Sequence, residues 1–170
     1  MYVNVRAMIE RVVNGDLQLY LQIRDKPNQP KAWELPGGQL EEYESMIDGL
    51  KREVREETGL ELTRIAGNDT YLQVRTNTGL LEGIQPFAVY QTLEGPVDSM
   101  GVYFRCEAKG TALQSGDQAR DGRWVPVKEL KQMAEQDLES FSWIDSVGIQ
   151  LYLQSEDVKP VQQLEKGDLR

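Results

Sequence analysis

Three glutamates, Glu53, Glu56 and Glu57, lie in a segment from residue 43 to residue 58 whose apolar residues recur at helical spacing. On a helix, positions related by i, i+3 and i+4 span about 100° of the surface, so the three carboxylates can converge on one cation. The same segment is also typical of a salt-bridged surface helix, because neighbours such as Arg52 can neutralise the glutamates. Taken alone, it leaves a metal site and a solvated charged face both open.

Histidine is absent from the 170 residues, and Cys106 is the only cysteine. The sequence therefore excludes Ser-His-Asp and Cys-His catalysis, histidine- or cysteine-based zinc sites and internal disulfides. Cys106 follows apolar residues of an expected strand, and we expect it to be a buried, inert thiol. Any chemistry must then rest on carboxylates, backbone groups, Arg, Lys, Tyr or a metal.

The net charge of −9 argues against a nucleic-acid partner, since surfaces that bind nucleic acid are usually basic. An acidic protein can still bind a phosphate substrate if cations lie between its carboxylates and the phosphates. No apolar run approaches the roughly 20 residues that a membrane helix needs, and the N-terminus lacks the pattern of a signal peptide. We therefore expect a cytoplasmic protein without a membrane partner.

The glutamates belong to a longer pattern. It runs through Gly38, Glu44, Arg52-Glu53-Val54, Glu56-Glu57 and Gly59-Leu60. It resembles the Nudix box, which is Gly, five residues, Glu, seven residues, Arg-Glu-aliphatic, one residue, Glu-Glu, one residue and Gly-aliphatic. Every specified position matches. The flanking segments 33–38 and 123–130 also resemble the family, so the resemblance covers nearly the whole chain and favours the metal site over the bland charged helix.

The resemblance implies an α/β/α sandwich around a mixed β-sheet, formed by one domain over residues 1–154 with a polar tail at 155–170. It implies a Mg²⁺-dependent pyrophosphohydrolase, with Mn²⁺ as a substitute, that cleaves a phosphoanhydride bond of a nucleoside diphosphate linked to another moiety. The expected partner is this small nucleotide-type molecule, and a homodimer is compatible with the family. The alternative is a catalytically silent domain that senses a nucleotide, but such domains often lose the box glutamates that are retained here.

The resemblance also implies roles for individual residues. Glu53 and Glu57 would be metal ligands, Glu56 a ligand or the catalytic base, and the Gly37 carbonyl a further ligand. Gly38 would let the backbone approach the substrate closely.

Other roles are expected around this set. Arg52 would orient a glutamate through a charge-assisted hydrogen bond, and Arg24 would face the phosphates. A later loop should add a carboxylate, for which we favour Asp117 over Asp121. For Glu44, a structural role at the start of the helix and a supporting role in the metal site remain equally open.

The elements that must position these residues follow from periodicity and turn signals. Alternating strands over 2–13 and 17–24 flank Asn14-Gly15, a strong hairpin signal. Helices are predicted at 43–58, 127–137 and 142–153, and strands at 61–75, 84–94 and 99–108. Trp33 is expected to pack beside the box, and Tyr71, Phe87 and Tyr90 are expected to pack in the core. Strands interleaved with helices indicate one α/β or α+β domain.

Overall fold

The chain begins with a long β-hairpin in the computed structural model, which describes residues 1–155. β1 (Tyr2–Val13) and β2 (Asp16–Arg24) pair antiparallel around Asn14 and Gly15. Both turn residues have positive φ, 52° and 83°, as a two-residue turn that follows the twist of the strands requires. The predicted hairpin is therefore confirmed, whereas the predicted tail lies outside the described residues except for Ser155.

Nine strands of the described chain form one mixed sheet, with the order β10-β11-β2-β1-β9-β5 along its main path. β1 pairs in parallel with β9, and the other pairings are antiparallel. The remaining strands are β3 (Trp33–Glu34), β4 (Gly37–Gln39), β5 (Glu61–Ile65), β8 (Ala88–Gln91), β9 (Ser99–Lys109), β10 (Ser115–Gly116) and β11 (Ala119–Pro126).

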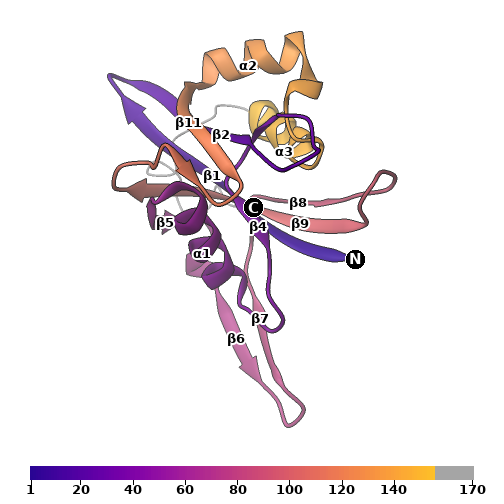
Figure 1. The fold of residues 1–170 in the computed structure, drawn as a ribbon. Coiled ribbons are helices and arrows are strands. Elements are labelled where there is room, and N and C mark those ends of the chain that lie inside the picture. The colour runs from indigo at the N-terminus through magenta and orange to yellow at the C-terminus, as the bar shows by residue number, and fades with distance from the viewer. Residues whose placement is uncertain (156–170) are drawn as a thin grey trace.

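Helices cover both faces of the sheet (Figure 1). α1 (Met46–Thr58) packs on one face, and α2 (Val127–Gln136) and α3 (Trp143–Gln154) pack on the other, with a short 3-10 turn at Leu138–Ser140 between them. The core is accordingly split into two clusters. Alternate residues of β1 belong to different clusters. Ala7 and Ile9 lie in the cluster beneath α1, and Met8 lies in the cluster beneath α2 and α3. This arrangement is the predicted α/β/α sandwich.

α1 carries the glutamates and is defined by its caps. The Ser45 side chain accepts a hydrogen bond from the Asp48 backbone N–H at 3.1 Å, so the helix begins at Met46, three residues later than predicted. Gly59 ends it in the left-handed conformation, with φ of 72°. The stripe of Ile47, Leu50 and Val54 is buried against the sheet, which leaves the glutamate face of the helix outside this core.

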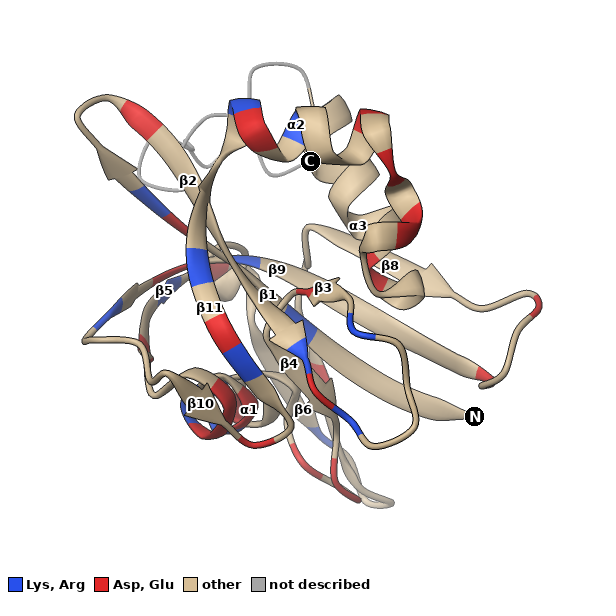
Figure 2. Cartoon of the chain, turned by 45° about the horizontal axis from the view of Figure 1, so that its top comes forward, with Lys and Arg blue, Asp and Glu red and all other residues tan. Residues whose placement is uncertain are grey.

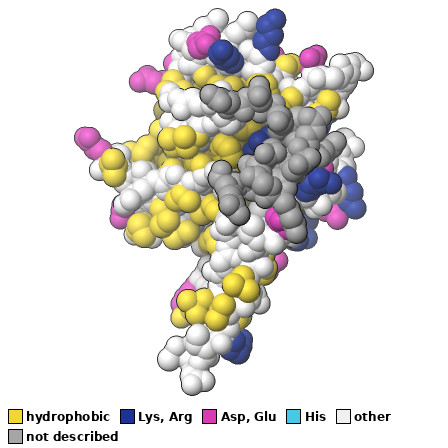
Figure 3. Space-filling view, turned by 180° about the vertical axis from the view of Figure 1, so that it is seen from behind, with side chains coloured by type: hydrophobic (Ala, Val, Ile, Leu, Met, Phe, Trp, Pro, Cys, Tyr) yellow, Lys and Arg dark blue, Asp and Glu magenta, His cyan; other side chains and the backbone are white. Residues whose placement is uncertain are grey.

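The predicted strand 61–75 is wrong as a single element, whereas the predicted strand 84–94 is confirmed over the shorter range of β8. β5 ends at Ile65, because Gly67 adopts a φ of 90° and leads into a 3-10 turn at Asn68–Thr70. β6 (Leu72–Arg75) and β7 (Leu80–Gly83) then form a separate two-stranded hairpin that extends away from the sheet (Figure 1). Its apolar side chains are largely exposed (Figure 3). No helix in the described chain is long and apolar enough to span a membrane.

Candidate active site

One cavity of about 410 Å³ gathers the residues that the sequence predicted for the site. They come from the end of β2, from β4, from the last two turns of α1 and from the turn between β10 and β11. The predicted residues that line it are Arg24, Gly37, Gly38, Arg52, Glu53, Glu56, Glu57 and Asp117. Acidic and basic positions are interspersed along α1 and alternate along the neighbouring β11 (Figure 2).

Two glycines bring β4 close to its neighbours. Gly37 has a φ of 139°, and a Cβ there would lie 2.1 Å from the Val5 carbonyl oxygen of β1. A Cβ on Gly38 would lie 2.5 Å from the carboxyl carbon of Glu53. Glycine at both positions therefore lets the chain pass between β1 and α1, and lets the Glu53 carboxylate lie directly against the backbone.

Arg52 organises the exposed side of the cluster. Its Nε and Nη2 donate to Glu44 at 2.7 and 2.8 Å, and its Nη1 donates to Glu53 at 2.8 Å and to Glu56 at 3.2 Å. The predicted contact between Arg52 and a glutamate is thus present. Glu44 does not line the cavity, and the hydrogen bond from Arg52 lowers the pKa of its carboxyl. Glu44 therefore contacts the site through Arg52, and both of its expected roles stay predictions.

Glu57 lies at the inner end of the cluster and is largely buried. Its Oε2 accepts hydrogen bonds from the Gly37 N–H at 2.9 Å and from Gln22 Nε2 at 2.8 Å. Burial nevertheless raises the pKa of Glu57 to about 8, with the nearby Arg6 guanidinium opposing the shift. A cation at this position would relieve that burial of charge, because it would take the place of the proton.

The donor set fits a hard divalent cation, since it consists of carboxylates and a carbonyl beside an open cavity. As positioned, no group of three or more Asp, Glu or Cys side chains within residues 1–155 is arranged to hold a metal ion. The contacts explain this, because Arg52 holds Glu53 and Glu56 while the β4 backbone and Gln22 hold Glu57. The Gly37 carbonyl accepts from Arg6 Nη1 at 2.6 Å, which uses one of its two lone pairs.

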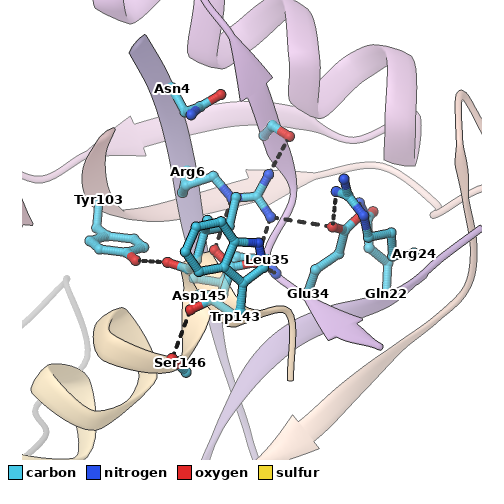
Figure 4. Close-up of polar contacts among 12 residues, drawn as sticks. Asn4, Arg6, Gln22, Arg24, Glu34, Leu35, Tyr103, Trp143, Asp145 and Ser146 are labelled. Atoms are coloured by element: carbon cyan, nitrogen blue, oxygen red, sulfur yellow. Dashed lines mark hydrogen bonds and ion pairs between the residues drawn. The ribbon is translucent and has the colours of Figure 1, made fainter. Parts of the chain in front are cut away.

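Sequence reasoning missed the buried ion pair behind the site, which joins Arg6 to Asp145 (Figure 4). Arg6 Nε and Nη2 donate to the two carboxylate oxygens of Asp145 at 2.9 and 2.5 Å. Asp145 also accepts from the Leu35 N–H at 3.1 Å, and Glu34 lies 3.5 Å from Arg6 Nη2. In the sequence, Arg6 stands out as a charged residue between apolar positions of β1, which could have indicated a buried ion pair. Its partner Asp145 is 139 residues away, however, and the sequence does not identify it. The pair anchors the Gly37 carbonyl to the sheet.

Arg24 lies at the end of β2 and lines the cavity, while its guanidinium group contacts Glu34 and Gln29. Its Nη1 lies 3.1 Å from Glu34 Oε2, and its Nε donates to Gln29 at 2.9 Å. Lys26 lines the cavity as well, and partial burial lowers the pKa of its ammonium. Two cations therefore line the cavity together with the α1 carboxylates.

The later loop also presents a carboxylate to the cavity. Asp117 lines it, and its backbone N–H donates to the Glu56 carbonyl at 3.2 Å, which ties the loop to α1. Asp121 does not line the cavity; it is exposed and lies 3.5 Å from Arg120. Asp117 therefore borders the cavity and Asp121 does not, and the catalytic role of Asp117 stays a prediction.

The aromatic residues pack largely as expected. Tyr90 is buried, and Phe87 and Tyr71 pack against the core. Trp33 also packs, but with the α2–α3 cluster on the opposite side of the sheet from α1, so its expected place beside the box is wrong. Strand alternation explains the difference, because β3 directs Trp33 and Glu34 to opposite faces.

The chain belongs to the NUDIX domain family, whose model matches residues 3–144. No curated protein sequence matches it significantly. Solved structures share the fold at low identity. One from a study of MutT from Aliivibrio salmonicida and Vibrio cholerae has a TM-score of 0.59 and 15% identity, covering 91% of this chain and 98% of that one. A possible asymmetric diadenosine tetraphosphate hydrolase from Jonesia denitrificans has a TM-score of 0.63 and 18% identity, covering 89% and 92%.

A third neighbour is the NUDIX domain of Shewanella oneidensis NrtR in complex with ADP ribose, with a TM-score of 0.54 and 18% identity over 89% of this chain and 85% of that one. At such identities the neighbours establish the fold. Family membership together with this fold places the chain among hydrolases that act on phosphoanhydrides.

Proposed function

We propose that this protein is a Mg²⁺-dependent pyrophosphohydrolase that cleaves a phosphoanhydride bond in a nucleoside diphosphate linked to another moiety. The observation that carries the proposal is the convergence of Glu53, Glu56 and Glu57 on one cavity with Arg24 and Asp117. Carboxylates and cations that line the same cavity suit a diphosphate that enters with a divalent ion.

Glu53, Glu56, Glu57 and the Gly37 carbonyl would hold the ion, which supplies charge neutralisation and an activated water when bound. Arg52 keeps the outer glutamates in place, as its hydrogen bonds to both show. Arg24 would attract the phosphate oxygens.

A carboxylate would accept the proton of the attacking water. We propose Glu56 or Asp117 as the group that accepts the proton of the attacking water, since both border the cavity. A general base contributes about 10²–10⁴ in rate, so its removal should leave measurable activity.

The test is a panel of nucleoside triphosphates, dinucleoside polyphosphates and nucleoside diphosphate sugars, incubated with Mg²⁺ and followed by chromatography of the products. We expect one class to release a nucleotide and a second phosphate-containing product, with Mn²⁺ supporting part of the activity and EDTA removing it. A folded, Mg²⁺-saturated protein that bound a nucleotide and cleaved none of the panel would instead be a nucleotide sensor.

The same proposal covers the partner and the location. The substrate is a small molecule rather than a nucleic acid, in keeping with the net charge of −9, and we propose a cytoplasmic location. A homodimer remains a proposal that light scattering would test, with a mass near twice 19.4 kDa as the supporting result.

A further inference from the structure

The β6–β7 hairpin has an apolar face and a polar face. Opposed residues of its two strands share a face, and successive residues of each strand alternate between the faces. The register thus places on one face Leu72, Val74, Leu81 and Gly83. On the other face it places Gln73, Arg75, Leu80 and Glu82. The first face therefore carries no polar side chain.

The polar face is the one that is tied to the rest of the molecule. Glu82 accepts a hydrogen bond from the Met46 N–H of α1 at 2.7 Å and another from the Tyr71 hydroxyl at 3.1 Å. Gln73 donates to the same hydroxyl at 2.6 Å. These contacts fix the base of the hairpin, and residues 72–83 project from it as an arm (Figure 1).

The apolar face of the arm is open to solvent. Leu72, Val74 and Leu81 are exposed to 62%, 47% and 58%, and Figure 3 shows hydrophobic side chains on the hairpin. The arm pairs with no further strand in residues 1–155. A hairpin on its own is marginally stable at best in water, and free strand edges beside exposed apolar side chains are typical of surfaces that bind another chain. The arm therefore lacks an apolar partner surface.

A groove of about 270 Å³ offers such a surface. It is formed by residues 90–94, at the end of β8, and by the first turns of α3, and is called the β8–α3 groove below. Its apolar lining includes Leu93, Trp143 and Val147, which are exposed to 93%, 43% and 42%. Among the described strands β8 pairs only with β9, so its second edge is free to accept a strand.

The arm and the groove also carry opposite charges. Arg75 at the end of β6 and Glu94 in the lining of the groove are both exposed, and neither forms an ion pair with another described residue. Two copies with a net charge of −9 repel each other, whereas the arm has no net charge, since Arg75 and Glu82 are its only charged residues. Because Glu82 is bonded to α1, the arm brings no unpaired carboxylate to the groove.

We infer that two copies of this chain associate by exchanging arms, so that the arm of each copy docks in the β8–α3 groove of the other and Arg75 pairs with Glu94. The base of the arm is fixed to α1, on the opposite face of the sheet from α3, so the groove that it fills belongs to a second copy. The inference specifies the interface of the homodimer proposed above and requires no catalytic activity.

The size of the contact sets the strength of the dimer. The arm is about 14 Å long, so one contact is smaller than the roughly 800 Å² that each partner buries in a standard interface. Two-fold symmetry repeats the contact, and we therefore expect a reversible dimer with a Kd in the micromolar range. Trp143 and Ile144 line both the groove and the active-site cavity, which places the docked arm beside the site.

Analytical ultracentrifugation over a wide range of protein concentration tests the exchange. We expect the wild type to shift from the 19.4 kDa monomer to the dimer as the concentration rises. Arg75→Glu and Glu94→Arg should each weaken the dimer by roughly tenfold or more, because each places like charges together at both contacts. An equal mixture of the two variants should recover the wild-type affinity, since the mixed dimer pairs the two substituted side chains at one contact and keeps the original pair at the other.

Lys128→Glu is the matched control, because it makes the same change of net charge at an exposed residue that lines neither the groove nor the cavity. Leu81→Ser tests the apolar face at an exposed position and should also weaken the dimer. A dimer that is weakened by Arg75→Glu but not by Glu94→Arg would place the arm on another surface and overturn the exchange, as would a mixture that does not recover. A wild type that stays monomeric would overturn both this interface and the homodimer, while the hydrolase proposal would stand or fall separately on the substrate panel.

Discussion

Removing the Asp145 carboxylate should destabilise the protein strongly, because it leaves the buried Arg6 guanidinium without its main partner. Asp145 is fully buried and accepts three hydrogen bonds, two from Arg6 and one from the Leu35 N–H. Breaking a buried pair by removing one partner costs about 3–5 kcal/mol. Glu34 remains 3.5 Å from Arg6, so we expect Asp145→Ala to lie near the lower end, at about 3 kcal/mol.

At this chain length about 3 kcal/mol corresponds to a fall in Tm of roughly 6–12 °C. Urea unfolding followed by tryptophan fluorescence gives the free energy directly. Asp98→Ala is the control, since the exposed side chain of this aspartate lies 3.7 Å from the N-terminal amine and its removal should change stability by less than about 0.5 kcal/mol. The double variant Arg6→Met with Asp145→Leu should lose less stability than Asp145→Ala, because the Arg6 charge is removed together with that of Asp145 and Glu34 keeps its ion pair with Arg24. A loss below about 1 kcal/mol for Asp145→Ala would refute this reasoning.

Three further results are expected. Burial raises the pKa of Glu57 to about 8 from an ordinary value of 4.5, so the folded state binds more protons between these values. The contribution of Glu57 to metal-free stability should therefore be greatest below pH 4.5 and fall as the pH rises to about 8, and Glu57→Gln should remove this contribution from the urea-midpoint profile. Asp117→Asn should lower kcat by about 10²-fold, the lower end of what a general base contributes, whereas Glu53→Gln should lower it more; the reverse order in steady-state assays would exchange their roles. Burial also raises the pKa of the Cys106 thiol well above its usual value, so native protein should resist a thiol reagent that labels the urea-unfolded chain.

Local signals in the sequence were enough to predict α1 and its chemistry. The apolar stripe, the glycine after the helix and the spacing of the glutamates are all contained within some twenty residues, and the structure keeps them together. The start of the helix was predicted three residues early, because acidic residues before Ser45 continue a helix-like composition while the cap itself depends on one hydrogen bond.

The parts that were missed depend on contacts between distant segments. Arg6 and Asp145 meet only after β1 and α3 are packed, and a single sequence carries no sign of that pairing. Residues 61–75 read as one strand, since their alternation continues across Gly67, whose positive φ is set by the close approach of the Gln85 carbonyl.

The central claim is that the α1 carboxylates bind Mg²⁺ for the cleavage of a phosphoanhydride bond. The most direct measurement is a Mg²⁺ titration of turnover for wild type, Glu53→Gln and the control Glu61→Gln, which changes an exposed glutamate of β5. The account predicts turnover that saturates with Mg²⁺ in wild type and Glu61→Gln, and a loss of about 10³-fold or more in Glu53→Gln. Turnover that persists in EDTA, or that is unchanged in Glu53→Gln, would contradict it.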